Sequence, residues 1–242
     1  MSEAFILRRG GTGALRGGGS APEFTYTGNY EQIDDGNRNW RIKFLTSGTL
    51  TFTTLGNADG GIDVFLMGGG GSGGYGQLYY AGGGGKEGGI KTARGLTVQT
   101  QTPYEIVVGA GGSRKGDGEM SEAFGETAAG GEHGKDGVSP GKAGTDSTVK
   151  AFEEENGESL GGNGGNGGGS TADFVLISAG KGGKPYGGKG GKYGNSWTTP
   201  GHGTAGPANT GAGGGGGGGC TYSANIYGAN GGSGIVIIRN AR

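Results

Sequence analysis

The amino-acid sequence predicts an all-β protein with essentially no α-helix, in which a small antiparallel β-sheet portion holds a bundle of extended, glycine-rich chains. Three observations predict it. Glycine supplies 69 of the 242 residues, and 57 of these glycines lie in residues 68–234. Short apolar runs of strand-like pattern flank and interrupt that region. Within the region, glycines recur every three residues, which is the period of the extended polyproline II type of helix.

The overall composition excludes several classes of protein. Leu, Ile, Val and Phe together number 37 residues, which is fewer than a conventional side-chain core needs. Disorder would be expected from this value, but 20 basic and 21 acidic residues leave a net charge of only -1, whereas unfolded chains usually carry a large one. The same balance argues against nucleic acid or an anionic membrane surface as a partner.

The sequence also bears on the compartment. Its first nine residues lack the basic and apolar regions of a secretory signal, and no apolar stretch approaches the roughly 18 residues of a membrane span. Cys220 is the single cysteine, which excludes an intrachain disulfide. We therefore expect a protein that is made in a reducing cytoplasm, is not inserted in a membrane, and leaves the cell by lysis or a dedicated machine.

Residues 1–22 precede the first apolar pattern and are predicted to form an N-terminal arm, and residues 23–67 form the β-strand portion. In the latter, Trp40, Ile42 and Phe44 alternate with basic residues, and Leu50 and Phe52 alternate with threonines, as in half-buried antiparallel strands. Between these two runs stands Gly48, where a hairpin connection would place a glycine. Residues 35–39 resemble the start of a calcium loop but lack its later glycine and glutamate, which favours a solvated hairpin turn.

The glycine-rich region, residues 68–234, contains two further strand segments at 96–108 and 174–178, and residues 235–242 form a closing strand. The three-residue period is seen in Gly161, Gly164 and Gly167 and recurs elsewhere. Pro140 interrupts one such series, which disfavours a collagen triple helix. We expect several polyglycine II helices to pack side by side, because backbones without Cβ atoms approach closely. The apolar strands would then hold their ends; a flexible linker is the alternative.

Three segments carry a resemblance to known families: Trp40–Phe52 (WRIKFLTSGTLTF), Ile62–Gly71 (IDVFLMGGGG) and Gly231–Arg239 (GGSGIVIIR). The chain resembles glycine-rich proteins of phage and prophage tails. It is also similar to the polyglycine II adhesin at the tip of T-even-like phage tail fibres and to the glycine-rich region of the anaplastic lymphoma kinase ectodomain. The resemblance implies a jelly-roll-like β-sandwich with an inserted polyglycine II bundle. The single cysteine departs from the kinase ectodomain, and the large β portion departs from the tail-fibre adhesin.

Motifs of catalysis are weak in this sequence. Residues 201–206 satisfy GxGxxG, but a chain so rich in glycine does so by chance, and no strand-then-helix context surrounds it. Residues 70–74 satisfy the nucleophile-elbow pattern, yet only His133 and His202 could supply its base. A single cysteine cannot build a zinc site of the usual spacing. We predict no enzyme activity, no cofactor and no metal.

Aromatic residues with few aliphatic neighbours are the candidate binding residues, because Tyr and Trp offer a large contact area at low entropic cost. Each of these aromatic side chains could instead cover the sides or ends of the bundle. The six favoured residues stand beside Gly, Pro or Asn-rich turns: Tyr79, Tyr80, Tyr186, Tyr193, Trp197 and His202. Lys181, Lys184, Lys189 and Lys192 could face an acidic glycan or simply keep the rod soluble. Arg8, Arg9 and Arg16 mark the arm as an attachment segment.

Together these features predict a tail-tip adhesin in the virion, which recognises a bacterial surface glycan or protein through loops of the bundle. Its arm would bind another tail component. One alternative is a purely structural spacer or cap of the tail. Another is an ice-binding protein, which the recurrent Lys and Tyr residues disfavour, because a flat ice-binding face favours small residues.

Overall fold

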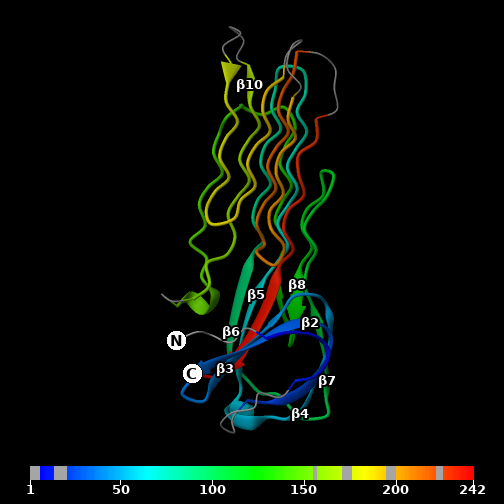
Figure 1. The fold of residues 1–242 in the computed structure, drawn as a ribbon, viewed down its shortest axis with the longest axis vertical. Helices are drawn as coiled ribbons and strands as arrows, with labels where there is room; N and C mark the ends of the chain where they lie inside the picture. The colour runs from blue at the N-terminus through cyan, green and yellow to red at the C-terminus, as the bar shows by residue number, and fades with distance from the viewer. Residues whose placement is uncertain (1–5, 14–20, 155–156, 171–175, 195–199, 222–225) are drawn as a thin grey trace.

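The computed structural model has two parts, a β-sheet base and a long rod of extended chains that rises from it (Figure 1). It describes residues 6–13, 21–154, 157–170, 176–194, 200–221 and 226–242. The predicted all-β class is confirmed. Within the described residues the only helical elements are two short 3-10 turns, η1 (Gly56–Gly60) and η2 (Ala151–Glu153).

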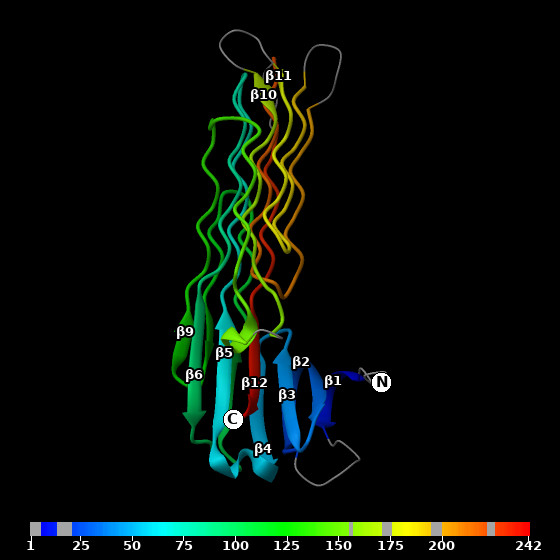
Figure 2. The same ribbon diagram turned by 90° about the vertical axis from the view of Figure 1, so that its left-hand side faces the viewer.

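The strands of the base belong to one antiparallel sheet. They are β1 (Ile6–Gly13), β2 (Glu23–Gly36), β3 (Asn39–Phe44), β4 (Gly48–Thr54), β5 (Ile62–Met67), β6 (Ile90–Leu96), β7 (Pro103–Val107), β8 (Ser121–Ala123), β9 (Glu126–Ala128) and β12 (Ile235–Asn240). A separate two-stranded pair, β10 (Gly169–Ser170) and β11 (Leu176–Ile177), lies at the far end of the rod (Figure 2).

The large sheet curls until it is nearly closed. Its strand order is β6-β5-β12-β3-β2-β4-β7-β8-β9, with β1 on the outer edge of β2. The two ends of this order meet, because β6 packs near β9 and β5 near β8. The expected division into the two sheets of a sandwich is therefore not confirmed: the described strands are hydrogen-bonded neighbour to neighbour in one sheet.

The predicted hairpin at Gly48 is wrong. β3 and β4 do not pair with each other; both pair with the same edge of β2, one after the other, so that residues 39–54 form a single bent partner of β2. At the bend, a Cβ on Gly48 would lie 2.7 Å from the amide nitrogen of Gly28, so the two backbones cross in close contact. The hairpin turn is instead at Asn37 and Arg38, both with positive φ, within the residues expected to form a solvated turn.

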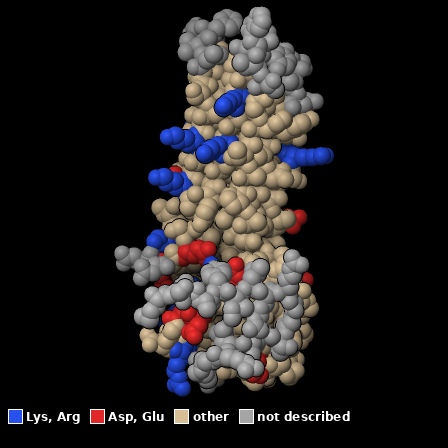
Figure 3. Space-filling view, viewed as in Figure 1, with Lys and Arg blue, Asp and Glu red and all other residues tan. Residues whose placement is uncertain are grey.

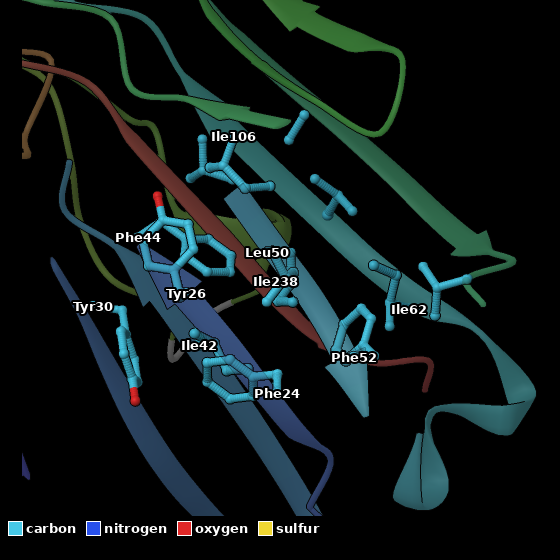
Figure 4. Packing of buried hydrophobic residues seen from close by; sticks show 14 of the residues in the cluster. Phe24, Tyr26, Tyr30, Ile42, Phe44, Leu50, Phe52, Ile62, Ile106 and Ile238 are labelled. Carbon is cyan, nitrogen blue, oxygen red and sulfur yellow. The ribbon is translucent and has the colours of Figure 1, made fainter. Parts of the chain in front are cut away.

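The main core fills the inside of the curled sheet (Figure 4). Alternation placed its members correctly: Trp40, Ile42, Phe44, Leu50 and Phe52 are all buried there. Aromatic rings of β2 complete it, and burial raises the pKa of the Tyr26 phenol well above its usual range. One face of these strands is apolar and the other polar because only one face is covered.

The continuous apolar runs of β5 and β12 have a different cause, since every residue of both strands is buried. One face of each strand lines the main core, whereas Phe65, Met67, Ile235 and Ile237 point to a second cluster on the outer side of the sheet. That cluster is closed by η2, whose Phe152 lies against Phe65. Burial on both faces explains why these two strands show no polar alternation.

A buried ion pair ties β5, β12 and η2 together. Arg239 and Asp63 are each about 1% exposed, and Arg239 Nε donates to Asp63 Oδ2 at 3.1 Å. The guanidinium also lies 4.1 Å from the ring of Phe152 and donates from Nη1 to Glu154 Oε1 at 2.6 Å. Because a buried charge without its partner is costly, this network specifies where η2 docks.

The rod continues directly from strands at both ends of the sheet order, β6-β5-β12 and β7-β8-β9. The two ends meet where β9 lies beside β6 (Figure 2). Ser121 bridges the junction, because its buried hydroxyl donates to Met67 O at 2.7 Å and accepts from Gly109 N at 3.0 Å. The strands thus hold the chain ends of the rod in place, as the sequence predicts, and reduce the entropy cost of ordering glycine.

Within the rod, successive amides of one segment donate to three different neighbours in rotation. Gly68, Gly71 and Gly74 donate to one neighbouring segment, residues 83–89, while Gly70 and Gly73 donate to another, residues 229–232. Ser72 donates to the hairpin 109–120, as Gly69 does. A three-residue rotation of this kind matches the period read in the sequence.

Segment 211–219 lies at the centre of the rod and is completely buried. The amides of residues 213–219 donate to residues 162–168, 71–74 and 201–204, and carbonyls of the segment accept from residues 82–88, 188–194 and 229–232. These are six different stretches of chain. Contact is so close that a Cβ on Gly215 would lie 1.9 Å from the carbonyl oxygen of Lys189. Backbone therefore forms the core of the rod.

Some predicted boundaries shift in the structure. Residues 6–13 of the expected arm pair with β2, with Arg8 opposite Tyr30 and Arg9 opposite Asn29, so this part of the arm is an edge strand of the sheet. Arg16 lies outside the described residues. The expected strand at 96–108 is the end of β6 and all of β7, and the one at 174–178 is represented by β11. β8 and β9 were not anticipated, because each has only three residues.

Candidate binding surface on the rod

Two of the predicted aromatic residues form the turn at the far end of the rod. Gln77 and Tyr80 exchange backbone hydrogen bonds there, with Leu78 and Tyr79 between them. Tyr79 has φ +64, a left-handed conformation that is uncommon for a residue with a Cβ. Leu78 is 49% and Tyr80 57% exposed. The turn therefore presents two large apolar side chains to solvent.

Tyr193 comes to the same end of the rod. Its neighbour Gly194 donates to Gly219, and Tyr79 donates through its amide to Cys220. Burial raises the pKa of the Tyr193 phenol, nearby Tyr79 and Cys220 act in the same direction, and a hydrogen bond with Ser170 opposes them. The structure thus brings Tyr79 and Tyr193, two of the predicted binding residues, to the same end of the rod.

The other predicted residues are separate from this end or cannot be placed. Tyr186 is 39% exposed in the turn that follows residues 176–184, and its amide donates to Gly161, farther down the rod. Trp197 lies outside the described residues. His202 is on the side of the rod, so the five predicted residues that the structure describes do not form one cluster.

His202 belongs instead to an aromatic cluster that the site prediction missed. Its ring stacks on Tyr227, with centroids 5.6 Å apart and planes 9° from parallel, and its Nδ1 accepts from Tyr227 N at 3.0 Å. Tyr227 in turn meets Tyr75 edge to face at 4.9 Å. Lys115 Nζ lies 4.3 Å from the centre of the Tyr75 ring and pairs with Asp136 at 2.5 Å.

This cluster borders an open groove of about 500 Å³. Its lining residues are Tyr75, Arg114, Tyr227, Gly228 and Asn230. Tyr227 is 45% exposed, and Arg114 and Asn230 are also exposed. An aromatic wall with a few polar groups is the usual make-up of a small-ligand site.

Tyr75 and Tyr227 could have been found from one signal. Tyr75 directly follows the glycine run 68–74, and Tyr227 stands immediately before Gly228, so each marks the place where a close-packed segment acquires a side chain. Nothing in the sequence indicates that the two segments are neighbours, because that contact joins residues about 150 positions apart.

Charged side chains are unevenly distributed over the molecule. Lys181, Lys184, Lys189 and Lys192 are all exposed on the rod. In Figure 3 basic side chains stand out along the rod, whereas the acidic ones visible in that view lie mostly over the β-sheet base. The face of the rod seen in Figure 3 therefore offers mainly basic side chains to a partner.

The motifs with a catalytic pattern are placed in structural positions. Ser72, the serine of the elbow pattern, is completely buried, and its hydroxyl donates to the Gly116 carbonyl. His133 pairs with Asp117 on the surface, and this hydrogen bond lowers the pKa of the Asp117 carboxyl. In the part of the chain that the structure describes, no group of three His, Cys, Asp or Glu side chains is placed to hold a metal ion.

Fold and surface together define a class: an all-β protein whose curled sheet supports a glycine-rich rod with exposed aromatic side chains. The chain belongs to the glycine-rich domain family, whose model matches residues 45–241. No curated protein matches the sequence. Among the described residues, no helix is long and apolar enough to cross a bilayer.

Proposed function

We propose that the chain is a receptor-binding component of a phage or prophage tail that recognises a glycan or protein on the bacterial surface through its rod. The observation that carries this proposal is the exposure of large side chains on a scaffold that does not need them for folding. Leu78, Tyr80 and Tyr227 are 45–57% exposed, although the rod is held together by backbone contacts. Aromatic residues on a rigid support are typical of recognition surfaces.

The rod in this proposal is a bundle of polyglycine II helices. Its support is the rotation of hydrogen bonds among three neighbours and the six-fold surroundings of segment 211–219. Such a bundle is stiff without a side-chain core, which suits a part that holds a binding surface away from its attachment point. The base, with Arg8 and Arg9 in its edge strand β1, would be the side that meets another tail component.

The proposal is tested by binding of the labelled protein to a panel of intact bacterial strains. Two double variants remove similar amounts of exposed apolar surface at opposite ends of the rod. Leu78→Ser/Tyr80→Ser changes the far end, and Ile90→Ser/Met120→Ser changes the junction with the base, where these side chains are 43% and 48% exposed. Both should melt at the wild-type temperature, because exposed side chains contribute little to stability.

We expect saturable binding to a few strains, at least ten-fold weaker for the far-end variant and unchanged for the junction variant. Equal loss in both variants would indicate non-specific apolar adhesion and would contradict the proposal. Absence of binding to every strain of a panel that includes the phage's own host would favour the alternative of a structural spacer.

A further inference from the structure

The aromatic groove exists because one hairpin of the rod is short. Residues 109–120 leave the base, turn at 113–116 and return, whereas segment 68–76 continues beyond them. Ser72 N donates to Gly116 at 3.1 Å, but three residues farther on Tyr75 N has no hairpin carbonyl to bind. Asp136 Oδ1 accepts from it instead at 2.7 Å. Beyond the hairpin turn, side chains therefore line the space beside segment 68–76 in which another rod segment would otherwise lie.

Aromatic rings line the opening in a fixed arrangement. Tyr227 is held by His202, whose ring stacks on it, and by the edge-to-face contact with Tyr75. The hydrogen bond from Tyr227 N to His202 Nδ1 fixes the two residues further. Little side-chain entropy remains to be lost when a ligand binds against Tyr227.

Among the described residues, Arg114 is the cation at the groove that has no ion-pair partner. Lys115 pairs with Asp136, and the carboxylate of Asp117 is hydrogen-bonded to the ring of His133. Arg114 is exposed in the hairpin turn, lines the groove, and makes no ion pair with the described residues. A guanidinium binds a carboxylate through two parallel hydrogen bonds, which makes an anionic group the complementary ligand feature.

We propose that this groove is a subsite for a sugar residue that carries a carboxylate, as in an acidic surface polysaccharide. The apolar face of the sugar ring would pack on Tyr227, its carboxylate would bind Arg114, and Asn230, which can both donate and accept, would bind a hydroxyl group. A volume of about 500 Å³ accommodates one or two sugar residues and lies within the range of small-ligand sites. The inference deepens the proposed function and rests on it for the bacterial origin of the glycan.

The test uses the full chain and oligosaccharides of glucuronic and galacturonic acid, with glucose and galactose oligosaccharides of equal length as neutral probes. Binding is measured by ligand-observed NMR and calorimetry. Arg114→Gln removes the cation, Tyr227→Ala removes the ring, and Tyr227→Phe keeps the ring. Arg38→Gln is the matched control, since Arg38 is also an exposed arginine with positive φ in a turn, but in the base.

We expect an acidic oligosaccharide to bind at least ten-fold more tightly than its neutral counterpart. Arg114→Gln should abolish that preference, and Tyr227→Ala should weaken binding at least ten-fold. Tyr227→Phe, which keeps the ring, should recover most of the affinity that Tyr227→Ala loses, and the control Arg38→Gln should bind as the wild type does. Equal affinity for acidic and neutral probes, or equal effects of Arg114→Gln and Arg38→Gln, would overturn the assignment.

The proposed sugar subsite and the proposed adhesin function can be contradicted independently of each other. Binding to cells without binding to any acidic oligosaccharide would overturn the subsite and leave the adhesin standing. Binding to an acidic oligosaccharide through Arg114 and Tyr227, without binding to cells, would support the subsite and contradict the adhesin. Loss of fold in Tyr227→Ala would show in its melting temperature, and Arg114→Gln then decides the question.

Discussion

Glycine takes the place in the rod that apolar side chains take in the sheet. In the base, burial of Phe, Ile and Leu removes apolar surface from water. In residues 213–219, all glycine, the buried atoms are backbone atoms, and their close contacts depend on the absence of a Cβ. The stabilising interactions are then N–H···O hydrogen bonds between segments, supported by weak Cα–H···O contacts.

A single added methyl group should therefore disturb the rod. In Gly215→Ala the Cβ would lie 1.9 Å from the Lys189 carbonyl oxygen, so backbone must move, at a cost of about 3 kcal/mol. For a chain of this length the melting temperature should fall by roughly 6–12 °C. The control is Gly89→Ala on the exposed side of the rod, where the nearest atom is 3.2 Å away. Equal melting of the two variants would contradict close packing at Gly215.

Acid should weaken the docking of η2. The hydrogen bond from Arg239 lowers the pKa of Glu154 below its ordinary value of 4.5, so the ionised carboxylate stabilises the folded state above that pH. The contribution is lost as the pH falls through the lowered pKa. Glu154 is 49% exposed, which limits the effect to below about 1 kcal/mol.

The measurement is the melting temperature across roughly pH 5 to 3, the window in which a carboxylate with a lowered pKa becomes protonated. Glu154→Gln should flatten the decline, whereas Glu153→Gln, on the exposed neighbour, should keep the wild-type slope. A steeper decline in Glu154→Gln would have the wrong sign for this explanation.

At the scale of an element, the stability of a rod segment depends more on which positions of the three-residue period hold glycine than on how many glycines the segment contains. In segment 187–194 Gly188 and Gly191 are buried, while Lys189 and Lys192 are exposed. Gly188 faces the Thr204 carbonyl so closely that its Cβ would lie 2.0 Å from that oxygen. Each lysine thus stands one position after a residue that only glycine can occupy.

Exchanging two neighbours should break this segment without changing its composition. Gly188→Lys/Lys189→Gly turns the lysine toward segment 200–206, and we expect a melting temperature at least 10 °C below that of the wild type, since a long charged side chain enters a backbone contact. Lys189→Gly alone should melt within a few degrees of the wild type. Thermal unfolding followed by circular dichroism compares the three proteins. A double variant as stable as the single one would show that glycine is not required at position 188.

At the scale of the whole molecule, the sheet and the rod stabilise each other. Strands at both ends of the sheet order continue into rod segments, so ordering the base fixes the ends of chains that would otherwise be flexible. In return, the first residues of the rod join the chains that leave neighbouring strands: Gly68 N donates to Gly89 O, and Gly234 N donates to Gly109 O.

Hydrogen exchange should reveal this mutual support. The amides of residues 213–219 are buried and hydrogen-bonded, so we expect them to exchange as slowly as those of β12, through global unfolding alone. Amides of the exposed hairpin at 113–116 should exchange much faster. NMR-detected exchange makes the comparison, and exchange of residues 213–219 within seconds would indicate a flexible glycine linker.

The sequence could predict what depends on local pattern. Alternation identified the core faces at Trp40–Phe44 and Leu50–Phe52, the glycine period indicated extended chains packed side by side, and the shortage of helical pattern excluded α-helix. It misplaced the hairpin at Gly48, because a glycine between two strands is equally compatible with a turn and with a bend. Of the candidate site it identified His202 but not its partners.

The sequence by itself determined the two kinds of packing in this protein. Glycine without a Cβ permits close packing of backbones in the rod, and alternating apolar residues permit a side-chain core in the sheet. Only the tertiary structure decided which segments are neighbours. All glycine segments are nearly alike, so their partners depend on where the strands release each chain and how long each hairpin is. The groove between Tyr75 and Tyr227 follows from that arrangement, because it forms where one hairpin ends and its neighbours continue.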